Sequence, residues 1–212
     1  MMLNAIIAGF LVATFLMVIA KRITALIRMF RIESIFLLLY TLYMGLSQRH
    51  LELLVVCALI FTFKIVIIPL VLLRITRRIN AEEDLGLLVN PQVSLIIALI
   101  FAYLSYLFTY KSMGLAHSPV LVGFITAMTA VCIGFFLMVS RLKALGQVIG
   151  LLVMENAIFL AASMIAGGMP FFVEIAFFFD IFVFVVIVEV FVYKVNRLFT
   201  HIDTSKMQSL KG

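Results

Sequence analysis

Long apolar runs separated by short polar connections make up most of this chain. Seven runs approach the roughly 20 residues that a membrane-spanning helix needs, and they cover residues 2–20, 32–48, 52–73, 93–110, 119–140, 145–166 and 171–193. The connections and the tail hold every lysine and arginine except Lys64. The pattern predicts an all-α, polytopic membrane protein with seven transmembrane helices.

The composition supports this interpretation and excludes several function classes. Of the 212 residues, 66% are hydrophobic and 12% are charged, whereas soluble domains average about 45–50% apolar and about 25% charged residues. The seven runs leave no room for an extramembrane catalytic domain. The net charge of +6 reflects the connections, so we expect lipid contacts and no nucleic-acid binding.

The basic residues fall on alternate connections, which predicts the orientation of the chain. Arg49 and Lys111 lie on one side of the predicted bundle. The other side holds Lys21, Arg22, Arg28, Arg31, Arg74, Arg77, Arg78, Arg141, Lys143, Lys194, Arg197, Lys206 and Lys211. Cytoplasmic connections carry the excess of lysine and arginine. We therefore predict an external N-terminus and a cytoplasmic C-terminus in a bacterial or archaeal inner membrane.

Two acidic residues interrupt the last two apolar runs. Counted from the turn at Gly167–Gly168, Glu155 lies 12 residues before it and Asp180 lies 12 residues after it. At about 1.5 Å per residue, an antiparallel hairpin places both carboxylates at one depth, roughly 18 Å from the turn. Because a charge near the bilayer centre is costly, this depth favours a proton or ion site facing the bundle interior.

Lys64 adds a cation to the same layer, about 12 residues into the third run. Desolvation moves carboxyl and ammonium pKa values toward each other, so these three groups are candidates for a proton relay. The alternative is a purely structural ion pair, in which Lys64 neutralises either Glu155 or Asp180. Pro69 removes a backbone hydrogen bond near Lys64 and predicts a kink there.

Other polar residues contribute less. Glu174 and Glu189 lie near the two ends of the last run, where each is a candidate for the entrance or exit of a proton path. Cys57 and Cys132 sit singly in apolar runs, without the spacing of a metal or redox site. We expect no cofactor or metal in this chain.

The run LKALGQVIGLLVMENAIFLAASMI, the run VEIAFFFDIFVFVVIVEVFVYKV, the stretch FKIVIIPL and the terminal SLKG resemble component E of hydrogenase-4. That family supplies a membrane subunit of formate-hydrogenlyase-type complexes, which are built on group 4 nickel–iron hydrogenases. The resemblance implies a non-catalytic subunit beside antiporter-like membrane subunits and a membrane-anchored nickel–iron hydrogenase arm. The nickel–iron and iron–sulfur centres would lie in those partners.

The C-terminal part is also similar to the three-helix K subunit of respiratory complex I and to the C subunit of Mrp-type antiporters. This likeness divides the chain into a four-helix part over 1–115, a three-helix part over 116–195 and a cytoplasmic tail over 196–212. The second intramembrane glutamate of that family maps onto Asp180. The first maps onto Leu152, whereas the acid of this chain is Glu155, one helical turn further on.

These observations predict a proton-translocating or redox-coupling subunit of an energy-converting hydrogenase complex, with Glu155, Asp180 and Lys64 as its relay. Two rivals stay open. One is a transporter, either an autonomous small one or a subunit of a cation/proton antiporter. The other is a structural membrane anchor, in which the buried charges form ion pairs and nothing more.

Overall fold

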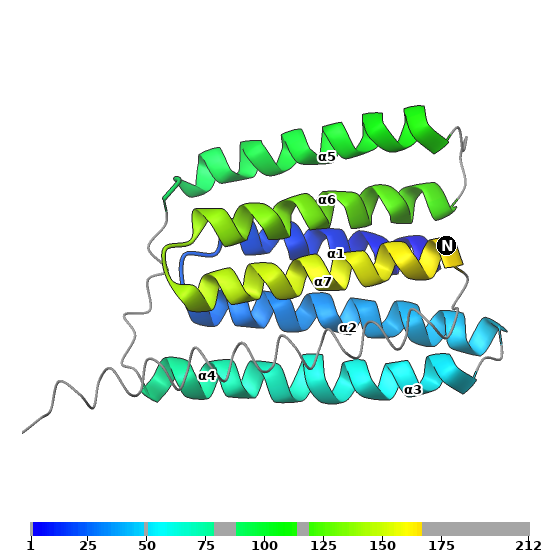
Figure 1. Cartoon of the computed structure of the whole chain (residues 1–212), viewed down its shortest axis with the longest axis horizontal. Helices are drawn as coiled ribbons and strands as arrows, with labels where there is room; N and C mark the ends of the chain where they lie inside the picture. The colour runs from blue at the N-terminus through cyan, green and yellow to red at the C-terminus, as the bar shows by residue number, and fades with distance from the viewer. Residues whose placement is uncertain (1, 49–50, 79–87, 114–118, 167–212) are drawn as a thin grey trace, which may run out of the picture.

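The computed structural model describes residues 2–48, 51–78, 88–113 and 119–166, which form six helices (Figure 1). One of the six is continuous through three labelled parts, α3, η1 and α4. The bounds are α1 Met2–Ile19, α2 Ile23–Gln48, α3 Leu51–Leu59, η1 Ile60–Ile67, α4 Ile68–Arg78, α5 Pro91–Met113, α6 Pro119–Ser140 and α7 Ala144–Ala166. Proline opens both α5 and α6, as its fixed backbone angle and missing N–H favour.

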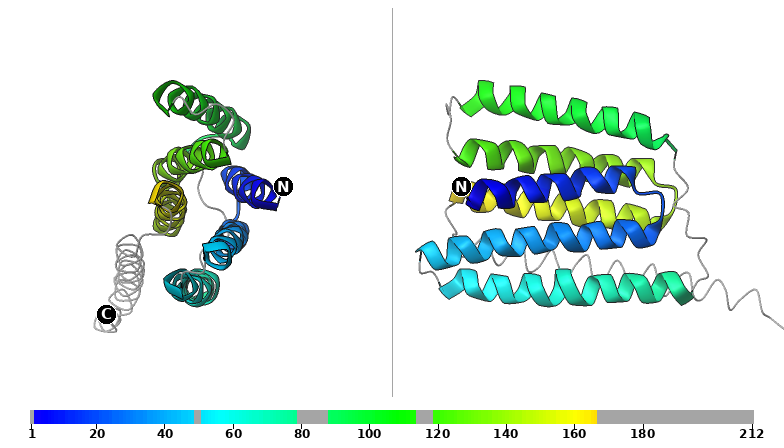
Figure 2. Two further views of the ribbon diagram at one scale, coloured as in Figure 1. Left: turned by 90° about the vertical axis from the view of Figure 1, so that its right-hand side faces the viewer. Right: turned by 180° about the vertical axis from the view of Figure 1, so that it is seen from behind.

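The helices run side by side with their axes nearly aligned (Figure 1). Seen end on in Figure 2, α5 lies at one edge of the bundle and the α3–η1–α4 helix lies at the other, with α6, α1, α7 and α2 between them. The closest partners are α6 with α7 and α1 with α2. Helix α2 also packs against α7 and η1. Helices from the beginning and from the end of the described sequence therefore contact each other in the middle of the bundle.

Five of the helices are long and apolar enough to cross a membrane. The spans are Met2–Ile19, Leu53–Arg77, Pro91–Lys111, Val120–Ser140 and Ala144–Met164. The protein is therefore a multi-pass membrane protein, as the sequence predicts. The seventh predicted run, 171–193, lies outside the described residues, as does the tail.

Helix α2 corrects one prediction. The stretch 21–31 was predicted as a connection because it holds four basic residues, but the helix begins at Ile23 and is 26 residues long. Its buried positions recur with a helical period, at Ile23, Leu26, Ile27, Phe30, Glu33, Ser34, Leu37, Tyr40 and Thr41. Arg28 and Arg31 fall on the exposed face between them. The apolar stripe decides the helix, and the arginines are accommodated outside it.

The helix that carries Lys64 is π-helical over Ile60–Ile67. The amide of Ile68 donates to the carbonyl oxygen of Phe63, five residues back, instead of four as in an α-helix. Pro69 follows directly. In an α-helix the proline ring would collide with the carbonyl of Ile65, and the wider π turn relieves that collision. The predicted disturbance near Lys64 is therefore a π-helical segment, a feature found frequently at functional sites.

Helices α6 and α7 cross at two glycines. A Cβ atom on Gly134 would lie 2.7 Å from the amide nitrogen of Met154 and 2.8 Å from the carbonyl oxygen of Gly150. A Cβ atom on Gly150 would likewise lie 2.7 Å from the amide nitrogen of Met138. Backbone touches backbone here, as at the small-residue crossings of membrane helices.

A buried arginine lies at the end of the bundle where α1 ends. Arg141 lies in the turn between α6 and α7, and its Nη2 donates to the carbonyl oxygens of Met17 (3.1 Å) and Val18 (3.0 Å). These carbonyls belong to the last turn of α1, where a cation is favourable. Burial lowers the pKa of Arg141 to about 10, so the guanidinium is still charged at neutral pH.

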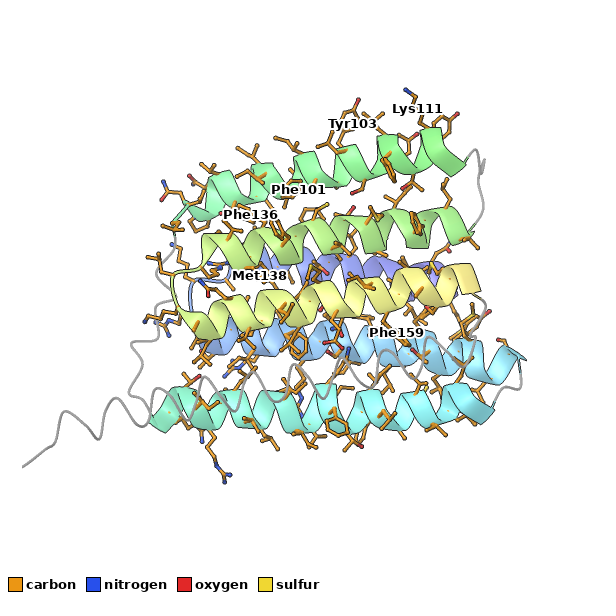
Figure 3. The ribbon with its side chains drawn as sticks, in the orientation of Figure 1. Phe101, Tyr103, Lys111, Phe136, Met138 and Phe159 are labelled. Carbon is orange, nitrogen blue, oxygen red and sulfur yellow. The ribbon has the colours of Figure 1, made fainter. Side chains whose placement is uncertain are left out.

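Helix α5 is the most exposed of the spans. Figure 3 shows Phe101 of α5 and Phe136 of α6 between the two helices, whereas Tyr103 and Lys111 point away from the bundle. The two phenylalanine rings meet edge to face, with centroids 6.3 Å apart. The outer face of α5 carries large exposed apolar residues along its whole length, so it can contact lipid or another membrane subunit.

The interior contains two apolar clusters. The first contains Met17 of α1, Phe30 of α2, Ile68 and Leu72 of α4, and Leu152 and Val153 of α7. The second contains Phe10, Leu37, Ile60, Ala157 and Leu160. On each of four helices, one or two buried polar residues lie along the sequence between the residues of the first cluster and those of the second.

Candidate functional site

These buried polar residues of four helices meet in one layer between the two apolar clusters. Helix α1 contributes Thr14, α2 contributes Glu33 and Ser34, η1 contributes Lys64, and α7 contributes Glu155 and Asn156; all six are buried. Each lies at an inward position of its helix, where its neighbours one turn away are core residues. The helical period that buries the apolar residues therefore also forces these polar groups together.

Lys64 and Glu155 form the ion pair at the centre of this layer. Lys64 Nζ lies 2.6 Å from Glu155 Oε1, and the two side chains are 2% and 5% exposed. Glu155 lies at the middle of the 23-residue helix α7. A short charge-assisted hydrogen bond of this kind is among the strongest that side chains make, and it offsets part of the desolvation of both charges.

Asn156 connects this pair to a second carboxylate. Lys64 Nζ donates to Asn156 Oδ1 over 2.9 Å. The amide nitrogen of Asn156 donates to Glu33 Oε2 over 3.1 Å and to Ser34 Oγ over 3.3 Å. The orientation of this amide follows from chemistry, because an ammonium group only donates and must face the carbonyl oxygen. Both amide hydrogens and the amide oxygen of Asn156 are therefore engaged.

Glu33 connects the network to Thr14 of α1. Its Oε1 lies 2.8 Å from Thr14 Oγ1, which also lies 3.0 Å from the carbonyl oxygen of Phe10. The carboxyl group is fully buried. The continuous path is thus Thr14, Glu33, Asn156, Lys64 and Glu155, and it runs sideways across the bundle from α1 to the α3–η1–α4 helix.

This arrangement can hold and exchange protons. Lys64 and Glu155 are within proton-transfer distance, and Glu33 is a second carboxyl group two hydrogen bonds away from Lys64. Backbone groups of the described helices are used mainly in the helices' own hydrogen bonds, so side chains supply the ionisable groups of this layer. The two apolar clusters lie on either side of the layer along the bundle axis. They separate its polar groups from water at both ends of the bundle.

The structure brings together two of the three residues predicted as a relay. Within the part of the chain that the structure describes, the ion-pair partner of Lys64 is Glu155. Asp180, Glu174 and Glu189 lie outside the described residues, so their place in or beside this layer stays a prediction. Whether the pair relays protons or only neutralises charge also stays a prediction.

Sequence reasoning missed Glu33, and the cause is the misplaced start of α2. With the helix assumed to begin at residue 32, an acid at position 33 is interfacial. With the true start at Ile23, Glu33 lies ten residues inside, or about 15 Å along the axis. The signal was the spacing of Ile23, Leu26, Ile27 and Phe30, which continues directly to Glu33.

Within the described residues, no three His, Cys, Asp or Glu side chains come close enough to hold a metal ion. Cys57 and Cys132 are free thiols on different helices, and Cys57 is buried as a small apolar residue would be. The described layer offers ammonium, amide, hydroxyl and carboxyl groups.

Comparison with known proteins finds a distant homologue. The chain is 24% identical over 204 residues to the uncharacterized protein Rv0085 of Mycobacterium tuberculosis, a match that covers 96% of this chain and 93% of the relative. No protein-family model matches the chain, and no solved structure matches it. The two proteins thus correspond over nearly their whole lengths.

Proposed function

We propose that this chain is a membrane subunit of an energy-converting hydrogenase complex of the formate-hydrogenlyase type, and that its buried charged layer takes part in proton translocation. The observation that carries the proposal is the Lys64–Glu155 ion pair in the middle of the bundle, extended by Asn156 to Glu33. Buried ionisable groups at this depth are characteristic of proton paths.

The network runs across the bundle, from helix to helix at one depth. A sideways path suits a subunit that passes protons or a change of charge between neighbours better than it suits a channel along the membrane normal. The exposed faces of α5 and of the α3–η1–α4 helix lie at opposite edges of the described bundle (Figure 2), where antiporter-like subunits would be accommodated. The resemblance to component E of hydrogenase-4 supports the same assignment.

The distribution of basic residues supports an inner-membrane orientation with this end of the bundle in the cytoplasm. The turn from α1 to α2 carries Lys21 and Arg22, the last part of α4 carries Arg74 and Arg77, and the turn from α6 to α7 carries Arg141 and Lys143. These three places lie at the same end of the bundle (Figure 1). By the positive-inside rule the first residues of α1 then face outward.

The first experiment is to identify what co-purifies with the full chain from mildly solubilised native membranes. We expect antiporter-like membrane subunits and the large and small subunits of a nickel–iron hydrogenase, which carry the metal centres. A cation/proton antiporter without a hydrogenase would favour the second candidate, an antiporter subunit. A lone chain or a homodimer would contradict the subunit assignment and favour an autonomous transporter.

The second experiment tests the role of the charges in the assembled complex. Glu155→Gln and Asp180→Asn preserve shape and remove charge, so we expect normal assembly and hydrogen evolution with loss of proton translocation. The control is Ser163→Ala, which changes α7 two turns away from Glu155, where the hydroxyl donates to the carbonyl oxygen of Leu160 in its own helix. Retention of proton translocation in both variants would leave a structural anchor as the function.

A further inference from the structure

Glu33 differs from Glu155 in having only neutral partners. Its two oxygens are bonded by the hydroxyl of Thr14 and the amide of Asn156, and the side chain is fully buried. Glu155 by contrast contacts the Lys64 ammonium directly. Among the described residues of this layer, Lys64 supplies the positive charge, and Asn156 stands between it and Glu33.

Among the described residues of this layer, the charges of Lys64 and Glu155 offset each other in their ion pair. An ionised Glu33 would add a second buried negative charge whose direct hydrogen-bond partners, Thr14 and Asn156, are neutral, which is costly in a low-dielectric interior. A protonated Glu33 removes that cost and needs one acceptor for its new O–H. The hydrogen bonds around Glu33 show which oxygen would carry it.

Oε2 is not that oxygen, because it faces the amide hydrogens of Asn156. Lys64 fixes this orientation by donating to the amide oxygen. The other oxygen, Oε1, lies 2.8 Å from Thr14 Oγ1. Thr14 has one hydroxyl hydrogen and two oxygen neighbours, and the second neighbour, the carbonyl of Phe10 at 3.0 Å, can only accept.

Both contacts of Thr14 are hydrogen bonds at once if Glu33 Oε1 donates to Thr14 and Thr14 donates to Phe10. We propose that Glu33 is a proton-binding site, with the proton on Oε1 toward Thr14, and that Asn156 links its environment to the charge of Lys64. When Lys64 gives a proton to Glu155, an ammonium and a carboxylate become a neutral amine and a carboxylic acid. The amine can then accept, and the amide of Asn156 is no longer held in one orientation.

The use of this proton as cargo rests on the proposed function, but its presence on Glu33 does not. It can be measured in the isolated full chain in lipid nanodiscs at neutral pH by infrared difference spectroscopy. We expect the spectrum of the native chain minus that of Glu33→Gln to show the carbonyl stretch of a buried carboxylic acid. Loss of carboxylate bands without that carbonyl stretch would overturn the proposal.

Thr14→Val is the matched second variant, since it keeps the shape of the side chain and removes the acceptor for the Glu33 proton. We expect the carboxylic acid band to persist at higher frequency, because its hydrogen bond is lost. This variant leaves Glu33 itself unchanged, so it tests the proposal even if Glu33→Gln fails to fold. A spectrum in which no carboxylic acid band responds to Thr14→Val would contradict the proton on Oε1.

The link through Asn156 is tested by changing both members of the ion pair to leucine. The double variant Lys64→Leu with Glu155→Leu leaves no ammonium to orient the amide, so the Glu33 band should shift although Glu33 and Thr14 are intact. An unchanged band would show that Asn156 transmits nothing. Because these spectra come from the isolated chain, they can fail while co-purification and proton translocation succeed, and the reverse is equally distinguishable.

Discussion

Helix α7 has two interfaces that follow opposite rules. Toward α6 it presents Gly150, and the two backbones touch without any side chain between them. Toward η1 and α2 it presents Glu155 and Asn156, and the contact consists of charged and polar groups. The interface with α6 is packed so closely that no larger side chain fits between the backbones, whereas the interface with η1 and α2 holds ionisable groups in place. One helix can thus be fixed rigidly on one side while its other side carries chemistry.

The comparison predicts which changes the bundle tolerates least. Lys64→Leu removes the cation and leaves Glu155 buried beside an apolar residue. Breaking a buried ion pair from one side costs about 3–5 kcal/mol, so we expect the free energy of unfolding, measured by titration with sodium dodecyl sulfate in mixed micelles, to fall by that amount. A loss below about 1 kcal/mol, the value of a solvent-exposed pair, would show that the charges are not desolvated.

Gly150→Ala changes the interface of α7 with α6. The added methyl group meets the backbone of α6, which cannot move aside without separating the helices. Overpacking of this kind costs about 1–3 kcal/mol, measured in the same titration. Gly9→Ala is the control, because the three atoms nearest to its methyl group all belong to the ring of Phe36, a side chain that can rotate, and not to a backbone. Equal losses for the two variants would contradict the role of backbone contact.

A smaller effect is expected at the edge of the polar layer. Ser34→Ala removes the longest hydrogen bond of the network, 3.3 Å from Asn156 Nδ2, and leaves the bond from Asn156 to Glu33 in place. The loss should be at the low end for a hydrogen bond, about 0.5 kcal/mol. A loss comparable to that of Lys64→Leu would mean that Ser34 orients Asn156, and that Lys64 does not.

The double variant Lys64→Leu with Glu155→Leu should also change stability little, in contrast to Lys64→Leu alone. Replacing a whole buried ion pair by apolar side chains is often neutral or stabilising, so the free energy of unfolding should return to within about 1 kcal/mol of the native value. Proton translocation by the complex should nevertheless be lost. If the double variant kept translocation, the pair would be structural.

The sequence predicted the apolar architecture well and the polar contacts only in part. The predicted run 119–140 coincides with α6, and 145–166 differs from α7 by one residue, because short turns with basic residues or proline bound them. Helical spacing and depth placed Lys64 and Glu155 in one layer. Their pairing could not be predicted from spacing, since the two residues are 91 positions apart and helix order within a bundle is set by packing.

The errors have physical causes that residues near Glu33 illustrate. Arg28 and Arg31 made the start of α2 resemble a connection, although long basic side chains can extend from an exposed helix face while the opposite face packs. Misplacing that boundary concealed the depth of Glu33. The one sequence signal for the π-helical segment was Pro69, and a proline can equally produce a simple kink.

The separation of Lys64 from Glu155 along the chain also has a consequence for biosynthesis. At about 5–20 residues per second, a ribosome needs roughly 5–18 s to add the 91 residues that separate the two. Throughout that interval Lys64 has been made, but Glu155, with which it forms an ion pair in the folded protein, has not. The same holds for the carbonyl of Met17 in the last turn of α1, because Arg141, which donates a hydrogen bond to it, lies 124 positions later in the chain. The early helices of this protein therefore reach the membrane before the residues that complete them, and final assembly begins only after α7 has been made.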